Sequence, residues 1–173
     1  EQLQWDVPDV MLCPVGAGSI LLGLHMGFSE LLQVGIVDRL PRLVAVQAAN
    51  NAALLQAFTA GDARVQPLPD PLPTLAEGIA LPAPVRDRKV LSALRETGGT
   101  VVAVTEAAIL AGLSALGRCG FFVEPTAAVI WDGFEQLQRC GFIKKGEKAV
   151  AVLSGNGLKA AQLMADNPAM LLK

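Results

Sequence analysis

The sequence has few of the side chains on which metal sites and many hydrolytic sites depend. Its 173 residues include one histidine, His25, and three cysteines. Cys13, Cys119 and Cys140 are odd in number and show no Cys-x-x-Cys spacing, so neither a disulfide framework nor a zinc site is indicated. A single histidine also argues against a histidine-rich metal site and against a His-dependent catalytic triad. We therefore expect no metal site.

Concentrated positive charge is also missing. The formal net charge is −2, the pI is about 5.4, and only Arg88-Lys89 and Lys144-Lys145 are adjacent basic pairs. The electrostatic footprint of a nucleic-acid binder is therefore absent, and no nucleic-acid partner is expected. The two lysines at 144 and 145 are interpreted as solvated charge.

No long apolar run is uninterrupted. The longest segment free of Asp, Glu, Lys and Arg runs from Val10 to Ser29, and Pro14 and several glycines interrupt it, whereas a membrane-spanning helix needs about 20 mostly apolar residues. Hydrophobic residues nevertheless make up 52% of the chain, which favours a sheet buried on both faces. No membrane association is expected, no signal peptide is visible, and the cytoplasm is the expected location.

Apolar periodicity predicts an α/β fold. Continuous apolar runs predict strands, and three- and four-residue spacing predicts helices that alternate with them, which is typical of parallel βαβ units. The expected architecture is an open, mostly parallel sheet of about four strands flanked by six helices. The predicted strands are 10–13, 43–46, 100–104 and 149–153, and the predicted helices are 19–34, 50–58, 87–96, 106–116, 124–138 and one after residue 157.

Residues 61–86 differ in composition from the rest of the chain. Proline fixes φ and removes a backbone donor, so we expect an extended surface segment that wraps the core. Leu68, Leu72, Leu75 and Ile79 are predicted to anchor it. The segment holds six of the eleven prolines: Pro67, Pro69, Pro71, Pro73, Pro82 and Pro84.

The turn Gly16-Ala17-Gly18-Ser19 lies between the first predicted strand and the first predicted helix. A glycine-containing turn at a helix N-terminus offers backbone N–H groups and the positive end of the helix dipole to an anion. This pattern predicts a phosphate-binding loop, and a tight βα turn with no ligand is the plain alternative.

Two nucleotide-binding motifs fit this turn poorly. The dinucleotide fingerprint needs a third glycine, where this sequence has Leu21, and an acidic residue after the second strand, which ends in Gln47-Ala48. A Walker loop needs a lysine after the last glycine, and Ser19 follows Gly18.

Two further positions carry polar groups near predicted helix starts. Ser154 follows the last predicted strand, at the edge of the sheet where open α/β folds bind ligands; an N-cap or turn serine is the alternative. Glu124 precedes Pro125 at a predicted helix start, where a carboxylate complements the helix dipole unless it lies close to the glycine loop. His25, on the first helix, is interpreted as a helix-surface or core residue.

Several segments together resemble the threonine synthase group of fold-type II pyridoxal-phosphate enzymes. Each segment alone is unspecific, but they occur in one order and at one spacing across essentially the whole chain. The segments are PVGAGS (14–19) with GFSELLQVGIVDRLPRLVAVQA (27–48), LAEGIA (75–80), ALRETGGTVVAVTEAAIL (93–110), FFVEPTAA (121–128) and VAVLSGNGLK (150–159).

The resemblance implies pyridoxal 5'-phosphate as cofactor and assigns a role to two places. It puts the cofactor phosphate on Gly16, Ala17, Gly18 and Ser19, although the family loop usually carries more glycine and asparagine. Ala17 and Ser19 depart from the residues usual in the family loop, but the backbone N–H donors remain at both positions. It also implies that the Ser154 hydroxyl hydrogen-bonds the pyridine nitrogen. A neutral donor there keeps this nitrogen largely unprotonated, which suits β- and γ-replacement or elimination.

The resemblance covers only the carboxy-terminal half of these enzymes. Residues 1–173 are thus expected to be the carboxy-terminal portion of a large domain, a fragment of something longer. The family carries its Schiff-base lysine in the amino-terminal half, so we expect no catalytic residue in this chain and no turnover by the chain alone. A bare sheet edge at the first strand is a further expectation. The chain's lysines fall outside the family's lysine motif: Lys89, Lys144, Lys145, Lys148, Lys159 and Lys173.

The parent reaction implied by the resemblance is a lyase-type conversion of O-phosphohomoserine to threonine and phosphate. A threonine dehydratase or a cysteate synthase is the alternative within the family. Outside it, the chain would be a non-catalytic phosphate-binding α/β module, or a structural fragment that binds nothing. The expected partner is a small amino-acid substrate, and because the family is commonly dimeric, a homodimer is an expected assembly.

Overall fold

The structure, a computed structural model, describes residues 1–166, and within them it contains four strands and six α-helices. These numbers agree with the sequence-based expectation, and the boundaries differ by a few residues. The elements are β1 (Val10–Pro14), α1 (Ser19–Gln33), β2 (Arg42–Ala48), α2 (Ala53–Ala60), α3 (Asp87–Glu96), β3 (Thr100–Val104), α4 (Glu106–Arg118), α5 (Pro125–Arg139), β4 (Ala149–Ala151) and α6 (Ala161–Asp166). Three short 3₁₀ turns are η1 (Ala49–Asn51), η2 (Glu77–Ile79) and η3 (Gly157–Ala160).

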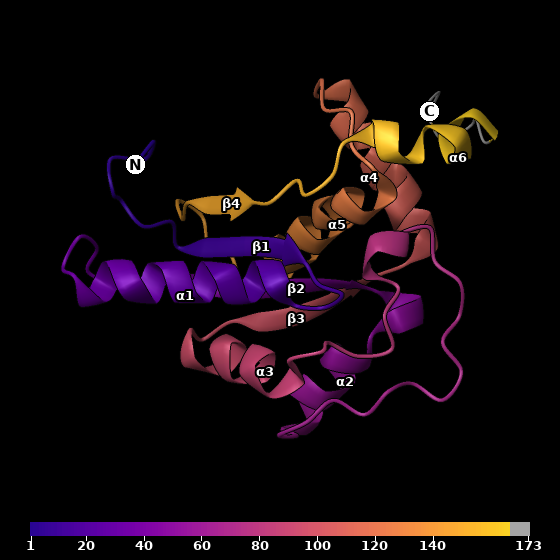
Figure 1. Cartoon of the computed structure of the whole chain (residues 1–173). Helices are drawn as coiled ribbons and strands as arrows, with labels where there is room; N and C mark the ends of the chain where they lie inside the picture. The colour runs from indigo at the N-terminus through magenta and orange to yellow at the C-terminus, as the bar shows by residue number, and fades with distance from the viewer. Residues whose placement is uncertain (167–173) are drawn as a thin grey trace.

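All four strands are parallel and lie in the order β3-β2-β1-β4 (Figure 1). The predicted parallel sheet is thereby confirmed. The expectation of a bare edge at the first strand is wrong, because β4 pairs with β1 in the register Val10↔Ala149. After α5 the chain returns beside β1, so the edges of the described sheet are β3 and β4.

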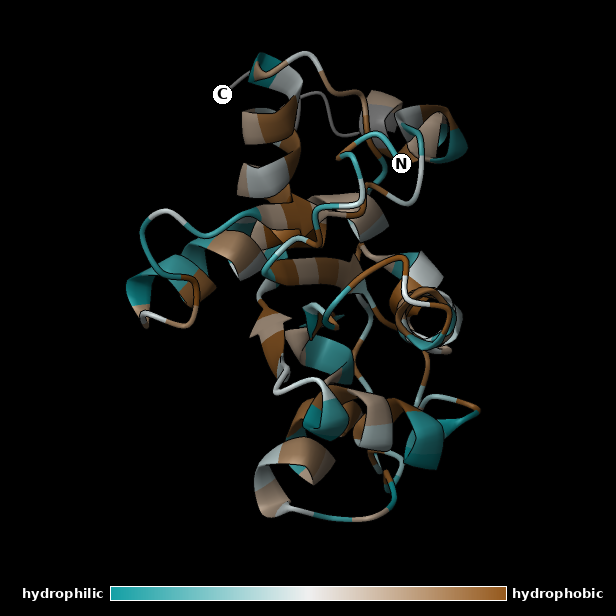
Figure 2. Ribbon diagram, turned by 90° about the vertical axis from the view of Figure 1, so that its left-hand side faces the viewer, coloured by the Kyte–Doolittle hydropathy of each residue, from teal (hydrophilic) through white to brown (hydrophobic). Residues whose placement is uncertain are grey.

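Helices cover both faces of the sheet, and each face has its own core. Alternate residues of a strand point to opposite faces. Leu12 and Val44 therefore join the core under α4 and α5, whereas Cys13 and Leu43 join the core under α1, α2 and α3. Figure 2 shows the strands mostly in the hydrophobic colour between helices of mixed hydropathy. The strands are apolar on both faces because both faces are covered.

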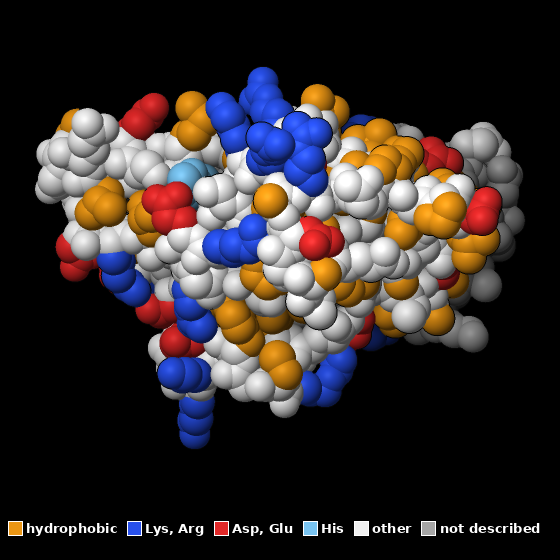
Figure 3. Space-filling model, turned by 90° about the horizontal axis from the view of Figure 1, so that it is seen from below, with side chains coloured by type: hydrophobic (Ala, Val, Ile, Leu, Met, Phe, Trp, Pro, Cys, Tyr) orange, Lys and Arg blue, Asp and Glu red, His pale blue; other side chains and the backbone are white. Residues whose placement is uncertain are grey.

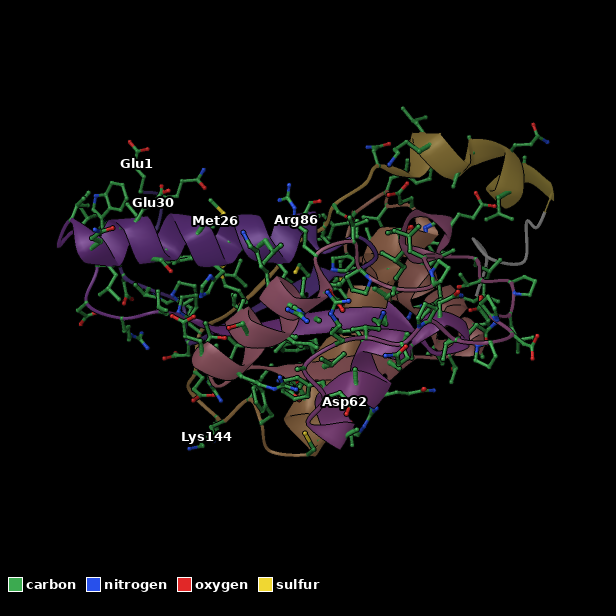
Figure 4. The ribbon with its side chains drawn as sticks, turned by 60° about the horizontal axis from the view of Figure 1, so that its bottom comes forward. Glu1, Met26, Glu30, Asp62, Arg86 and Lys144 are labelled. Carbon is green, nitrogen blue, oxygen red and sulfur yellow. The ribbon has the colours of Figure 1, made fainter. Side chains whose placement is uncertain are left out.

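Helix α1 lies on one face of the sheet with a long exposed side. It ends at Gln33, and Gly35 follows with φ +75, the left-handed conformation in which glycine commonly stops a helix. Met26 is 58% exposed, and Figure 4 shows Met26 and Glu30 on the outer side of the helix. The same figure shows Lys144 extending from the surface, consistent with its interpretation as solvated charge.

The proline-rich segment runs over the surface and is held both by apolar side chains and by hydrogen bonds to its backbone. Leu72 is 60% exposed, so its predicted role as an apolar anchor is wrong. Its carbonyl instead accepts a hydrogen bond from Asn51 Nδ2 at 3.0 Å. Leu68 and Leu75 are partly buried, and Ile79 in η2 is 4% exposed. The end of this segment thus reaches the sheet rather than only covering it.

Charged side chains are interspersed over the surface. Figure 3 shows acidic and basic groups mixed on the face seen from below, with one group of basic side chains at its upper edge. None of the helices in residues 1–166 combines the length and the apolar character that crossing a membrane requires.

Candidate functional site

The strand order creates a reversal point next to β1. From β1 the chain steps outward to β2 and then β3, and β4 is added on the opposite side of β1. Open α/β sheets bind ligands outside the carboxyl ends of their strands at such a switch point. Because β1 and β4 are parallel neighbours, the segments that follow Pro14 and Ala151 meet at this edge.

A cavity of about 280 Å³ lies at this edge. It contains all five residues predicted from the sequence as cofactor contacts, although they come from chain segments more than 130 residues apart. Its lining is Pro14, Gly16, Ala17, Gly18, Ser19, Ile20, Gly78, Ile79, Glu124, Thr126, Ser154 and Lys159.

The two glycines of the loop are required by the local geometry. A Cβ at Gly16 would lie 2.9 Å from the Cα of Ile79, and a Cβ at Gly18 would lie 2.5 Å from Cγ2 of Val90. Gly18 also has φ +86, a conformation that L side chains rarely adopt. These contacts explain the glycines without a ligand. An anion site is indicated instead by the cavity and by the helix that begins there.

Helix α1 begins at this cavity with unpaired backbone donors. The first N–H groups of a helix have no partner within it. Gly18 is the N-cap and offers no side-chain oxygen, and the first turn holds no acidic residue. Ser19 and Ile20 line the cavity. The positive end of the α1 dipole therefore faces the cavity, and no acidic side chain of the helix's own first turn complements it.

Ser154 follows β4 and lines the same cavity as this loop. Its side chain is exposed, and its hydroxyl makes no hydrogen bond within the described part of the chain. Of the two alternatives, the N-cap does not hold, because Asn156 is the N-cap of η3 and accepts a hydrogen bond from Leu158 N at 2.9 Å. A serine in the turn between β4 and η3 remains the plain alternative. The Ser154 hydroxyl is thus free to contact a ligand in the cavity.

Helix α5 brings a carboxylate and a hydroxyl to the same cavity. Glu124 is the N-cap of α5, and its side chain is 12% exposed and paired with Lys159 at 3.0 Å. Thr126 Oγ1 accepts a hydrogen bond from the backbone N–H of Gly78 at 3.0 Å. A Cβ at Gly78 would lie 2.8 Å from that oxygen, so the proline-rich segment closes tightly against α5.

Sequence reasoning missed several members of this site. The sequence indicates a role for Glu124 in the site only if it lies close to the glycine loop. In the structure both line the same cavity. Lys159 was set aside with the other lysines, although it stands five residues after Ser154. Gly78 and Ile79 lie in the segment LAEGIA. The position of this segment among those that resemble the family is the only feature of the sequence that points to these two residues. His25 lies outside the cavity and pairs with Glu96 at 3.1 Å.

Metal-ligating side chains do not cluster beside the cavity in the part of the chain that the structure describes. Within residues 1–166, no three His, Cys, Asp or Glu side chains gather so that they could hold a metal ion. Cys13, at the end of β1, is buried, and burial raises the pKa of its thiol to about 12 because the thiolate is poorly solvated there. The thiol is thus neutral at physiological pH.

A family model described as pyridoxal-phosphate-dependent enzyme matches residues 1–155. This chain belongs to the pyridoxal-phosphate-dependent enzyme family. The predicted family and cofactor are confirmed by this match and by the relatives below.

Several curated relatives are threonine synthases. The enzyme of Methanosarcina acetivorans is 35% identical over 167 residues, covering 96% of this chain and 41% of that enzyme. The enzyme of Methanocaldococcus jannaschii is 34% identical over 160 residues, covering 92% of this chain and 39% of that enzyme. The chain thus spans about two fifths of these relatives, and it corresponds to their carboxy-terminal portion.

Solved structures share the fold. Threonine synthase from Escherichia coli has a TM-score of 0.69 at 17% identity, covering 98% of this chain and 38% of that one. A fungal L-serine ammonia-lyase from Rhizomucor miehei has a TM-score of 0.71 at 19% identity, covering 96% of this chain and 52% of that one. At this identity the likeness establishes the fold alone, and the predicted parallel α/β fold of fold-type II enzymes agrees with it.

Proposed function

We propose that this chain is the cofactor-binding portion of a threonine synthase-type enzyme that converts O-phosphohomoserine to threonine and phosphate. The observation that carries the proposal is the cavity at the β1–β4 switch point, which unites the Gly16–Ser19 loop with Ser154. The similarity to threonine synthases over nearly the whole chain supports the reaction type.

The residues present suit a phosphorylated pyridine cofactor. The N-terminus of α1, with no acidic residue in its first turn, offers N–H donors to a phosphate. Ser154 offers a neutral hydroxyl to a ring nitrogen and leaves that nitrogen unprotonated. When bound, pyridoxal phosphate supplies an electron sink for the amino-acid carbon skeleton. The chain's own residues bind and orient this group, and we assign none of them a proton transfer.

We further propose that the chain alone is inactive. The Schiff-base lysine of the family is expected in the amino-terminal portion, which corresponds to no part of this chain. Lys159 is in the cavity, but its Nζ is 3.0 Å from a Glu124 carboxylate oxygen. An ammonium held in an ion pair is a poor nucleophile because it must first lose a proton.

Borohydride trapping tests the missing lysine. Pyridoxal phosphate is added to the chain, the mixture is reduced, and the modified lysines are mapped by mass spectrometry. We expect no lysine to be labelled stoichiometrically. Stoichiometric labelling of Lys159 would contradict the proposal that the chain lacks a lysine able to bind the cofactor covalently.

An activity measurement tests the reaction. The chain is joined to the amino-terminal portion of the Methanosarcina acetivorans enzyme, and threonine and phosphate are measured with O-phosphohomoserine as substrate. We expect both products in equal amounts from the joined protein and neither from the chain alone. Formation of 2-oxobutanoate from threonine would favour the dehydratase alternative, and sulfonate formation from O-phosphoserine and sulfite would favour the cysteate synthase.

The alternative function outside this enzyme family is that of a non-catalytic phosphate-binding module. It predicts that the joined protein releases no product while the chain alone still binds phosphate. Inorganic phosphate is expected to raise the melting temperature of the chain, since a ligand of the folded state stabilises it by mass action. No rise at high phosphate concentration would contradict the anion site itself and favour an inert fragment.

A further inference from the structure

Glu124 and Lys159 form an ion pair in the lining of the cavity. Lys159 Nζ lies 3.1 Å from Oε1 and 3.0 Å from Oε2 of Glu124, so it contacts both carboxylate oxygens. The Glu124 side chain is 12% exposed and that of Lys159 is 66% exposed. The lysine therefore reaches from the surface to cover an almost buried carboxylate.

The same carboxylate lies against the turn that carries Ser154. A Cβ at Gly155 would fall 1.9 Å from Glu124 Oε1, so only glycine fits beneath the acid. The backbone N–H of Glu124 donates to the carbonyl of Gly155 at 3.0 Å, and that of Gly157 donates to the carbonyl of Phe122 at 3.0 Å. The turn is thus joined to the start of α5 by two backbone bonds and one ion pair.

The sheet itself gives this turn little support. Strand β4 ends at Ala151, and the last backbone bond to β1 is from Val152 N to the carbonyl of Leu12 at 2.9 Å. Ser154 lies beyond that bond. Its position is consequently set by the contacts of the next residues with α5 rather than by strand pairing.

We propose that Glu124 and Lys159 are positioning residues that hold the Ser154 hydroxyl in place for the ring end of the cofactor. The inference rests on the proposed function, because it needs a ring-bearing phosphate in the cavity. It adds that the preference for a ring-bearing phosphate over phosphate alone depends on this ion pair. The pair also neutralises a carboxylate that would otherwise repel an anion.

Single substitutions separate positioning from charge. Lys159→Met leaves an unpaired carboxylate in the cavity, whereas Glu124→Gln leaves an unpaired ammonium. Their effects on the electrostatic attraction of any anion are therefore opposite. Their effects on the position of Ser154 are in the same direction, because each removes the ion pair that draws the turn onto α5.

The test compares two ligands on the whole chain. Inorganic phosphate reports on the loop alone, and pyridoxine 5'-phosphate adds the ring without an aldehyde that could react with lysines. The ratio of their Kd values, measured by calorimetry, gives the ring preference. We expect Lys159→Met and Glu124→Gln each to reduce this preference about five- to tenfold, which corresponds to the loss of one ordinary hydrogen bond. Lys159→Arg keeps the ion pair and is expected to keep the preference.

Two matched controls test whether a change of charge elsewhere on the chain also alters the ring preference. Glu135→Gln alters a carboxylate on the exposed side of α5, and Lys145→Met alters a lysine in the loop before β4. Both should leave the ring preference unchanged. If Lys159→Met and Glu124→Gln shift the affinity for both ligands equally, in opposite directions, the pair acts only through charge and the positioning role is overturned.

Failure of the proposed function gives a different result. If the wild-type chain binds neither ligand, the cofactor site is wrong, and the proposed ring recognition is overturned with it. Amide hydrogen exchange without ligand tests the structural part separately. We expect the amides of Glu124 and Gly157 to exchange about tenfold faster in Lys159→Met than in wild type, because their two hydrogen bonds join the loosened turn to the start of α5. Unchanged exchange would overturn the positioning role even if the phosphate site is correct.

Discussion

The carboxylate of Asp9 accepts a hydrogen bond from the backbone N–H of Lys148, 139 residues along the chain, at 2.8 Å. Its other oxygen accepts a hydrogen bond from Arg39 at 2.9 Å. The Asp9 backbone also joins the neighbouring strands, because Arg42 N donates to its carbonyl at 3.1 Å. The residue just before β1 is thus bonded to the segments in which β2 and β4 begin.

Replacing this acid should make stability less dependent on pH. The Lys148 N–H, and after it the Arg39 guanidinium, lower the pKa of Asp9 below its ordinary value of 3.8. A lowered pKa in the folded state contributes stability that is present above the unfolded pKa and is lost as the pH falls through the folded one. Asp9→Asn should therefore lower the melting temperature at pH 7 and flatten its fall below about pH 4.

Melting curves from pH 7 to pH 3 check this expectation. Asp70→Asn is the control, since Asp70 is exposed and makes no hydrogen bond within the described residues. An equal loss in both variants, or an unchanged pH profile for Asp9→Asn, would contradict a special role for Asp9.

Adding a single methyl group at Gly18 of the loop should destabilise the protein. Gly18→Ala places a Cβ 2.5 Å from Val90 and forces alanine to φ +86. Left-handed backbone alone costs about 1–3 kcal/mol, so we expect a loss of at least about 2 kcal/mol in the free energy of unfolding once the contact with Val90 is added.

Gly23→Ala is the matched control on the same helix. Nothing lies within 4 Å of a Cβ there, and alanine is favoured over glycine inside a helix by about 0.5–1 kcal/mol. Denaturant titration should therefore show Gly18→Ala destabilised and Gly23→Ala unchanged or stabilised. Similar losses in both would mean that the loop is not constrained as described.

The three cysteines should differ sharply in reactivity. Cys119 and Cys140 are exposed, whereas Cys13 is buried and its pKa is raised to about 12. The thiolate is the reactive form, so Cys13 should stay unmodified at pH 8. Titration of the native protein with a chromogenic disulfide should count two thiols, and a third after unfolding. Rapid reaction of all three in the native protein would place Cys13 outside the core.

Much of the fold was predictable from local patterns. Leu12 and Val44 belong to strands buried on both faces, and such strands are continuous apolar runs. Gly16, Gly18 and Ser154 follow predicted strands, and parallel strands present their carboxyl ends at one edge, so the site could be approximated without coordinates.

Other features depend on contacts that no local pattern encodes. Periodicity does not indicate which strand β4 pairs with. Because β4 pairs with β1, the first strand is an interior strand rather than the expected free edge. The spacing of Leu72 resembled that of an anchor, yet its carbonyl rather than its side chain is held. Lys159 enters the site only because the turn after Ser154 folds back onto α5.

Backbone amide shifts measured during a titration with pyridoxine 5'-phosphate test the central claim most directly. The claim is that one cavity binds a phosphorylated pyridine through the α1 N-terminus and Ser154. It predicts saturable shifts at the amides of Gly16, Ala17, Gly18, Ser19 and Ser154, with one common Kd. Inorganic phosphate should move the first four but leave Ser154 nearly unchanged. Absence of saturable shifts at the loop, or shifts confined to residues outside the cavity, would contradict the account.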